Sequence, residues 1–269
     1  MVSLRKRIPG PARSVYYGLF RLQLRLRCWY ADRSRPDHES GLPVPPALLR
    51  FRVSELVSRE EFLRIGLGTA MRIEQHLASM GVELAQAGRV LDFGCGCGRT
   101  LRWFLRDYPQ PEFHGADVDR DAIAWCREHL QAARFLANGP QPPLPYPDRH
   151  FDVIYCLSVF THLDEVLQDA WLAELGRLLA TGGVLLLTVH GERAASLLDD
   201  QGRRTLTKAG FLHRRSKKLT GILPDWYQTT WHSREYIVNR LAAHFEDIRY
   251  HPLDDSMQVI VTARARAKP

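Results

Sequence analysis

The chain has 269 residues, of which 45% are hydrophobic and 25% are charged, as is typical of globular proteins. This composition excludes a collagenous repeat, a disordered tail and a small disulfide-stapled domain, and the length fits one large α/β domain with an extension or two small domains. The five scattered cysteines form no C-x-x-C pair, which disfavours a closed zinc site and favours a reduced, intracellular compartment. No uncharged apolar stretch reaches the roughly 18 residues that a membrane-spanning helix requires.

The net charge of +7 is concentrated in an N-terminal arm, residues 1–35, which holds nine lysines and arginines and one acid, Asp32. Apolar residues recur there every three or four positions, which predicts an amphipathic helix, although the alternation over residues 22–27 also fits a strand. The apolar positions are Val15, Leu19, Leu22, Leu26 and Trp29. Two interpretations stay open: a basic helix lying on an anionic membrane, or a helix whose apolar stripe packs on the domain with its arginines in water. The second is favoured, because apolar helical stripes usually pack against their own protein. A transit peptide also stays open, since residues 1–31 contain arginines and no acid.

Residues 36–84 are expected to form a linker and cover helices. The proline-rich stretch 34–50 reads as the linker. Residues 55–80 then predict a helix that begins with a capping box of Ser58 and Glu61 and ends at Gly81.

From residue 89 onward, short apolar strands alternate with helical patterns, which predicts a doubly wound parallel sheet. Strands are expected at 89–93, 112–117, 134–137, 151–157 and 184–190, with helices at 100–108, 120–130 and 165–180. Two closing strands, 245–250 and 257–264, are separated by only a few residues and should therefore pair antiparallel. The predicted fold is a mostly parallel, Rossmann-like seven-stranded sheet whose last strand is antiparallel, preceded by N-terminal helices.

A glycine loop follows the first strand and carries the strongest motif of the chain, Gly94, Gly96 and Gly98. Glycines at the carboxyl end of a strand allow a ligand to approach the backbone closely. The dinucleotide fingerprint G-x-G-x-x-G would need glycine where this chain has Arg99, so the spacing disfavours a dehydrogenase.

The segment from Val90 to Thr100, with Asp92 ahead of G-x-G-x-G, resembles motif I of the class I S-adenosylmethionine-dependent methyltransferases. The resemblance covers residues 85–265 and continues at Asp117, which ends the second strand 25 residues after Asp92, and at Asn138, which follows the third. In that family an acid at the first of these positions accepts hydrogen bonds from the ribose hydroxyls. The resemblance therefore implies S-adenosylmethionine as cofactor, with the ribose on Asp117, the amino-acid part near the glycine loop and the adenine near Asn138. The cofactor-binding residues that it implies are Asp92, Gly94, Cys95, Gly96, Gly98, Asp117, Val118, Asn138, Gly139 and Ser158.

Three histidines are candidates for a general base, because the pKa of histidine lies near neutrality. His162 follows the fourth strand and His190 ends the fifth, so both lie on the edge of the sheet where ligands bind in such folds. His232 belongs to the segment 202–232, which breaks the strand–helix alternation and carries seven basic residues. No metal site is expected, since Cys95 and Cys97 alone cannot build a four-ligand site.

The segment 202–232 is the candidate lid of an acceptor site. It contains an aromatic cluster that could stack on a sugar or a ring: Trp226, Tyr227 and Trp231. A lid that merely packs on the core is an equally good interpretation.

The expected function is methyl transfer to a small-molecule or glycan acceptor, at oxygen. The alternatives are an RNA or protein methyltransferase that uses the basic segments, and a cofactor-binding relative without activity. Nucleic acid is not favoured as a partner, since no N-P-P-Y-type motif follows the fourth strand. The expected location is the cytoplasm, with contact to the inner membrane face if the arm binds lipid.

Overall fold

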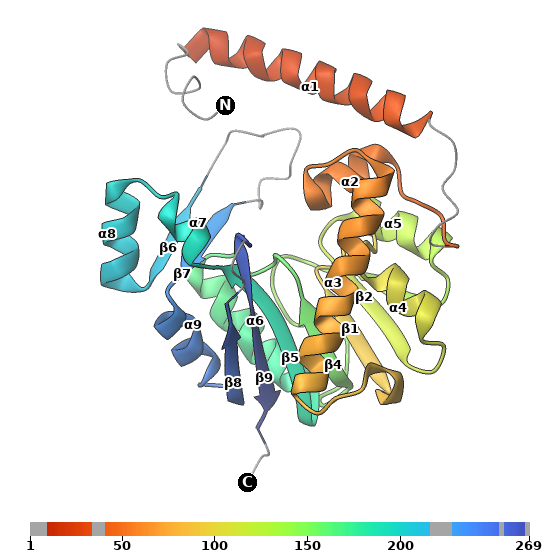
Figure 1. Cartoon of the computed structure of the whole chain (residues 1–269), viewed down its shortest axis with the longest axis vertical. Helices are drawn as coiled ribbons and strands as arrows, with labels where there is room; N and C mark the ends of the chain where they lie inside the picture. The colour runs from red at the N-terminus through yellow and green to blue at the C-terminus, as the bar shows by residue number, and fades with distance from the viewer. Residues whose placement is uncertain (1–9, 34–40, 216–227, 253–255, 267–269) are drawn as a thin grey trace.

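The computed structural model describes residues 10–33, 41–215, 228–252 and 256–266. Its centre is a seven-stranded sheet with helices on both faces (Figure 1). The strands of this sheet are β1 (Arg89–Phe93), β2 (Glu112–Asp117), β3 (Ala133–Ala137), β4 (Phe151–Cys156), β5 (Leu179–His190), β8 (Phe245–His251) and β9 (Gln258–Ala265). The helices are α1 (Gly10–Asp32), α2 (Ala47–Ser54), α3 (Arg59–Ser79), the 3₁₀ helix η2 (Leu84–Gln86), α4 (Leu101–Asp107), α5 (Arg120–His129), α6 (Glu165–Leu178), α7 (Glu192–Ser196), α8 (Asp200–Ala209) and α9 (Arg234–Leu241).

The strand order is β3-β2-β1-β4-β5-β9-β8. Strands β1 to β5 pair in parallel, with Val90 beside Phe113 on one side and Val153 on the other. The last strand, β9, runs antiparallel between β5 and β8. The predicted fold class is therefore confirmed, including the antiparallel pairing of the two closing strands.

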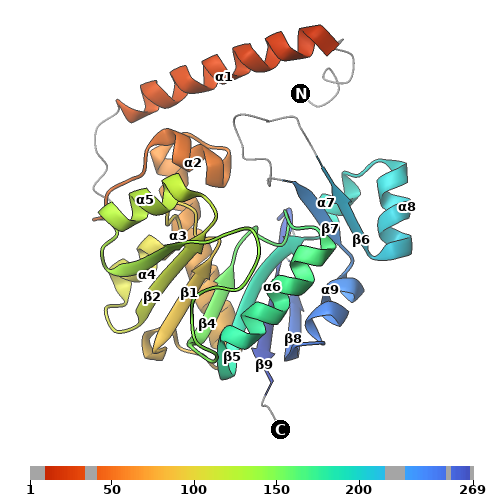
Figure 2. The same ribbon diagram turned by 180° about the vertical axis from the view of Figure 1, so that it is seen from behind.

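Each face of the sheet has its own hydrophobic core, because successive side chains of a strand point to opposite faces. Val90 and Val153 face the core formed with α3, α4 and α5, which includes Phe104. Their neighbours Leu91 and Ile154 face the core formed with α6 and α9. Figure 1 shows α3 across the first face, and Figure 2 shows α6 across the second. Burial on both faces explains why the central strands are almost continuously apolar.

The linker predicted over residues 34–50 is wrong at its end, because helix α2 begins at Ala47. The Asp32 carboxylate at the end of α1 accepts a hydrogen bond from the Ala47 backbone N–H at 2.8 Å. It also pairs with the fully buried guanidinium of Arg50 at 3.3 Å. The start of α2 thus depends on a contact distant in sequence.

The capping box ahead of α3 is confirmed, since Ser58 Oγ accepts from the Glu61 N–H at 3.2 Å.

Residues 10–32 of the N-terminal arm form a helix, so the strand alternative over residues 22–27 is wrong, and the expectation that the predicted apolar stripe packs on the domain is also wrong. Leu24 and Cys28, on another face of α1, are buried against Phe51 of α2. The four residues of the predicted stripe whose side chains are described are largely exposed: Leu19, Leu22, Leu26 and Trp29. The side chain of Val15 lies outside the described residues.

The segment 202–232 starts within α8 and includes a small two-stranded sheet, β6 (Phe211–Arg214) and β7 (Thr229–His232). The two strands pair antiparallel, with Phe211 beside His232. Figure 1 shows this sheet at the same end of the molecule as the carboxyl ends of β4 and β5. The described part of the segment, residues 202–215 and 228–232, therefore lies where a lid over a ligand site at that edge would have to be.

Candidate active site

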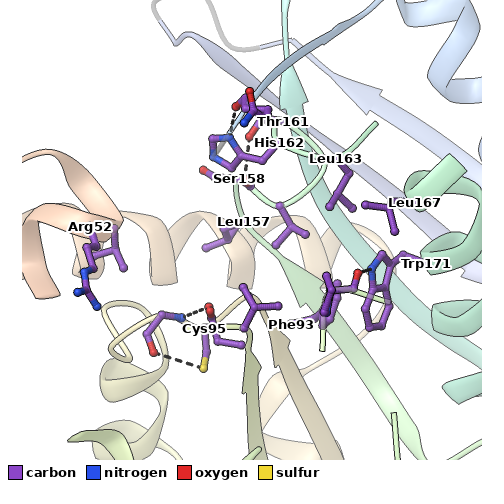
Figure 3. A pocket seen from close by; sticks show the side chains of 18 of the residues that line it. Arg52, Phe93, Cys95, Leu157, Ser158, Thr161, His162, Leu163, Leu167 and Trp171 are labelled. Atoms are coloured by element: carbon purple, nitrogen blue, oxygen red, sulfur yellow. Dashed lines mark hydrogen bonds between the residues drawn. The ribbon is translucent and has the colours of Figure 1, made fainter. Parts of the chain in front are cut away.

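A cavity of about 470 Å³ lies at the carboxyl ends of the parallel strands. Figure 3 shows its wall, with Cys95 of the glycine loop on one side and Trp171 of α6 on the other. Most of the residues that the sequence assigned to a site are part of this wall. They are Asp92, Gly94, Cys95, Gly96, Asp117, Val118, Asn138, Ser158, His162 and His190.

The glycine loop is shaped by three glycines with positive φ, at 82° for Gly94, 52° for Gly96 and 71° for Gly98. Such angles are unfavourable for residues with a Cβ atom. Added Cβ atoms would also collide with the surrounding protein: at Gly98 the nearest atom, Cδ1 of Leu130, would be 2.5 Å away. Gly98 packs against Leu130 of the α5–β3 turn instead of bordering the cavity, and Gly139 is likewise not brought to the cavity wall.

Asp117 ties the end of β2 to the glycine loop. One carboxylate oxygen accepts the Gly96 N–H at 2.7 Å, and the other accepts the Asp119 N–H at 2.8 Å. Burial is the largest influence on this group and raises the pKa of Asp117 to about 6, against the opposing effect of the two backbone donors. Each oxygen of a carboxylate can accept more than one hydrogen bond, so both keep capacity for a ligand.

Asp92 lies deeper than Asp117 and is almost fully buried. Its carboxyl group accepts a hydrogen bond from the Tyr155 hydroxyl at 3.0 Å. Burial raises the pKa of Asp92 to about 8, and the nearby charge of Asp117 acts in the same direction. A cation bound in the cavity would lower this pKa, because an opposite charge favours the ionised form.

We expect Asp92→Asn to remove a pH dependence from the stability of the protein. Between the pKa of an ordinary aspartate, 3.8, and about 8, folded Asp92 keeps a proton that the unfolded chain has released. The contribution of Asp92 to the free energy of unfolding therefore falls as the pH rises through this window. Asparagine cannot ionise and still accepts from Tyr155. Urea unfolding at pH 5, 6.5 and 8 measures the free energy of unfolding of both proteins. The difference, variant minus parent protein, should rise by at least ~1 kcal/mol between pH 5 and pH 8. Parallel pH curves for the two proteins would contradict the raised pKa.

Asn138 presents a buried acceptor to the cavity. Its side-chain N–H donates to the Gly139 carbonyl at 2.7 Å. Its Oδ1 is buried and has no hydrogen-bond partner among the described residues. A buried polar atom without a partner is costly, and in a ligand cavity it indicates where a donor of the ligand belongs.

His162 and His190 are both held in one tautomer by strand β7 and the residue before it. Nδ1 of His162 donates to the Gln228 carbonyl at 2.6 Å, and Nδ1 of His190 donates to the Thr230 carbonyl at 2.7 Å. A carbonyl can only accept, so the proton is on Nδ1 and Nε2 keeps its lone pair. Burial lowers the pKa of His162 to about 4 and also lowers the pKa of His190. Both rings are therefore neutral at pH 7.

His232 does not belong to this site, contrary to its place among the candidate bases. It is 4% exposed and is absent from the cavity wall. Its Nε2 donates to the side-chain oxygen of Gln168 at 2.9 Å, and burial lowers its pKa to about 3. The contact connects β7 to α6.

The predicted aromatic cluster is only partly described. Trp226 and Tyr227 lie outside the described residues. Trp231 is not part of the cavity wall; its ring stacks on that of His190 at 5.6 Å between centroids. Trp231 thus contacts a residue of the wall, His190, without bordering the cavity itself.

Several wall residues were not predicted. Arg52 comes from α2, whose presence depends on the contact with Asp32, and His213 comes from β6. An apolar part of the wall is formed by Leu163, Leu167 and Trp171, side by side in Figure 3. Leu163 directly follows the predicted residue His162 in the sequence, whereas no motif marks Trp171 within its helix.

The strand order, the glycine loop and the acid at the end of β2 together define a class I methyltransferase domain. Residues 91–185 match the family model described as a methyltransferase domain. This segment belongs to that family, and the family, the fold and the cofactor type predicted from the sequence are confirmed.

Curated relatives match a part of the chain of similar length. The fatty-acid O-methyltransferase of Mycolicibacterium smegmatis is 34% identical over 101 residues, 37% of this chain and 36% of that protein. The trans-aconitate 2-methyltransferase of Delftia acidovorans is 31% identical over 113 residues, 42% of this chain and 41% of that protein. The chain thus matches less than half the length of these relatives.

The fold extends further than the sequence match. The crystal structure of an S-adenosylmethionine-dependent methyltransferase from Mesorhizobium loti aligns with a TM-score of 0.54 at 16% identity. The alignment covers 71% of this chain and 96% of the other. The likeness extends beyond residues 91–185 and supports the fold of the sheet as a whole.

Proposed function

We propose that this protein transfers a methyl group from S-adenosylmethionine to an oxygen atom of a small-molecule acceptor. One observation carries the proposal: the acid at the end of β2, the glycine loop and two neutral histidines border the same cavity. S-adenosylmethionine supplies an electrophilic methyl group on a sulfonium. The tasks left to the protein are to hold both molecules in line, exclude water and accept a proton where the acceptor is a hydroxyl.

The residues present fit the cofactor. Asp117 keeps acceptor capacity for ribose hydroxyls, and Oδ1 of Asn138, which has no partner in the described part of the chain, can accept from the amino group of adenine. Gly94 and Gly96 leave their side of the cavity open to the amino-acid part. Asp92, whose carboxyl faces the same cavity, favours the positive charge of that part once it ionises.

The methyl acceptor would bind in the part of the cavity between the two histidines and the apolar wall at the start of α6. Leu163, Leu167 and Trp171 can hold an apolar body, while Nε2 of His162 or His190 can receive the proton of a hydroxyl. The segment 202–232 contributes His213, Arg215 and Gln228 to the wall, which supports its role as the lid of the acceptor site. The named relatives act on a fatty acid and on trans-aconitate, both organic acids, so carboxylates belong in the acceptor search beside hydroxyls.

The test is an acceptor screen with the full chain and S-adenosylmethionine. The panel should contain hydroxylated aromatics, sugars, short and long fatty acids, polycarboxylates and RNA, with mass spectrometry detecting the added methyl group. Methylation of an oxygen in a small molecule supports the proposal. Methylation of RNA alone, or cofactor binding with no product from any member, would contradict it.

Thr230 is expected to position the histidines. It is fully buried; its hydroxyl donates to the Leu163 carbonyl at 2.7 Å and accepts from Nδ1 of His213 at 2.8 Å. Its backbone N–H donates to the Thr161 carbonyl at 2.8 Å, and its own carbonyl accepts from His190.

Thr230→Val should remove the partner of Nδ1 of His213 and one of two donors to the Leu163 carbonyl, which keeps Nε2 of Gln168 at 3.1 Å. We expect it to destabilise the protein by about 1–3 kcal/mol in urea unfolding. Because β7 also holds the histidines, we expect kcat to fall about tenfold while cofactor affinity is unchanged. Thr230→Ser restores the hydroxyl and should recover both quantities. A valine variant as stable and as active as the parent protein would show that the hydrogen bonds of the hydroxyl do not matter, and a serine variant as impaired as the valine variant would show that the methyl group is needed as well.

A further inference from the structure

Helix α1 has two apolar faces, and among the described residues only one of them packs on the rest of the protein. The inner face includes Leu24 and Cys28, which are buried against Ala47 and Phe51. The Asp32 carboxylate fastens the end of the helix to the start of α2. Helix α1 is therefore held in a defined orientation by contacts that do not use its outer face.

The outer face carries five large apolar side chains that are 56–75% exposed: Leu19, Leu22, Leu26, Trp29 and Tyr30. Four of them follow the spacing of three, four and three residues that keeps side chains on one side of an α-helix. Leu22 on this face and Leu24 on the inner face are two residues apart, or about 200° around the axis. A run of exposed large side chains along one helix face indicates an interaction site, whereas scattered ones would not.

Positive charge borders this face. Arg25 and Arg27 are exposed, one on each side of this face at roughly 100° around the axis from its centre, and the guanidinium of Arg33 lies 3.9 Å from the ring centroid of Trp29. The acid in this helix is Asp32, whose carboxylate is turned toward Ala47 and Arg50. An apolar stripe flanked by arginines is the pattern of helices that lie in the interface of anionic membranes.

We propose that the outer face of α1 binds the surface of an anionic lipid bilayer, with Leu19, Leu22, Leu26 and Trp29 entering the acyl boundary and the arginines contacting headgroups. A second copy of the chain fits this face less well, because pairing two such helices would bring their arginine flanks together. None of the described helices is long and apolar enough to cross a membrane.

The bound geometry would place the bilayer beside the cavity. Figures 1 and 2 show α1 along the edge of the molecule where α2 and α5 begin and where the parallel strands have their carboxyl ends. Contact through the outer face would therefore put the membrane at the edge that carries the cavity, and not at the opposite end.

The test is flotation of the full chain with vesicles of phosphatidylcholine, with and without phosphatidylglycerol. We expect binding to the anionic vesicles, weakened at least about tenfold by Leu22→Ser with Leu26→Ser and weakened by added salt. The matched control exchanges two exposed apolar residues on other helices, Met71→Ser with Val166→Ser, which should bind like the parent protein. Far-ultraviolet circular dichroism checks that each variant keeps its helix content.

Three results would overturn this inference. They are no binding of the parent protein to anionic vesicles, equal binding of the Leu22 and Leu26 variant, and a dimer in light scattering that the same two substitutions dissociate. The last result would assign the face to a second copy of the chain. Methyl transfer is not part of the readout, so failure of the proposed enzymatic function would leave the test intact.

Discussion

Asp117→Ala is expected to weaken binding of S-adenosylmethionine about a thousandfold. The carboxylate is placed to accept hydrogen bonds from two ribose hydroxyls, each worth about 1.5–3 kcal/mol when one partner is charged. Its removal also frees the N–H groups of Gly96 and Asp119, so the glycine loop loses its link to β2. Calorimetric titration of the parent protein and the variant measures the effect directly.

The matched controls separate the loss of ligand contacts from a general effect of charge. Asp117→Asn keeps one acceptor oxygen and should lose only about 10–100-fold. Asp107→Ala removes an exposed carboxylate that pairs with Arg106 and should bind the cofactor like the parent protein. Equal affinities for the parent protein and Asp117→Ala would show that the cofactor does not use the end of β2.

The second large effect that we expect comes from exchange of the histidine proposed as general base. For a hydroxyl acceptor, His162→Gln or His190→Gln should lower kcat about 10²–10⁴-fold, the usual contribution of a positioned general base, without a change in cofactor affinity. The larger effect identifies the base. For a carboxylate acceptor, which has no proton to lose, both variants should retain most of their kcat.

The pH profile gives an independent readout. A base must be unprotonated, and burial lowers the pKa of His162 to about 4 and moves that of His190 in the same direction. The acid limb of the kcat profile should therefore lie below 6.5, the ordinary value for histidine. A limb at or above that value would contradict a base buried in this way. His232→Asn is the structural contrast: it should lower the melting temperature while the kcat of the folded protein is retained.

Much of the sheet could be predicted because its signals are local. The central strands are apolar on both faces, and β1 and β2 end at Phe93 and Asp117 as expected. The glycine loop could also be predicted from a short stretch of sequence, because its positive φ angles are unfavourable for residues other than glycine. Asn138 was predicted as an acceptor, and the structure adds that its Oδ1 is buried without a described partner.

The remaining features depend on contacts between distant segments. Helix α2 and its Arg50 are held by Asp32, 15 residues before the helix begins, and no local pattern predicts that contact. The helix in the arm was predicted from its period, but a helix with two apolar faces does not reveal which one meets the protein. His232 could not be separated from His190, because the distinction lies in the contact with Gln168.

The central claim is that the cavity binds S-adenosylmethionine, and calorimetric titration of the full chain with S-adenosylmethionine, S-adenosylhomocysteine and NAD tests it most directly. We expect micromolar binding of the first two at a ratio of one per chain, and no binding of NAD. Binding of NAD without either adenosyl compound would contradict the assignment and return the chain to the dinucleotide-binding enzymes that its glycine spacing disfavours.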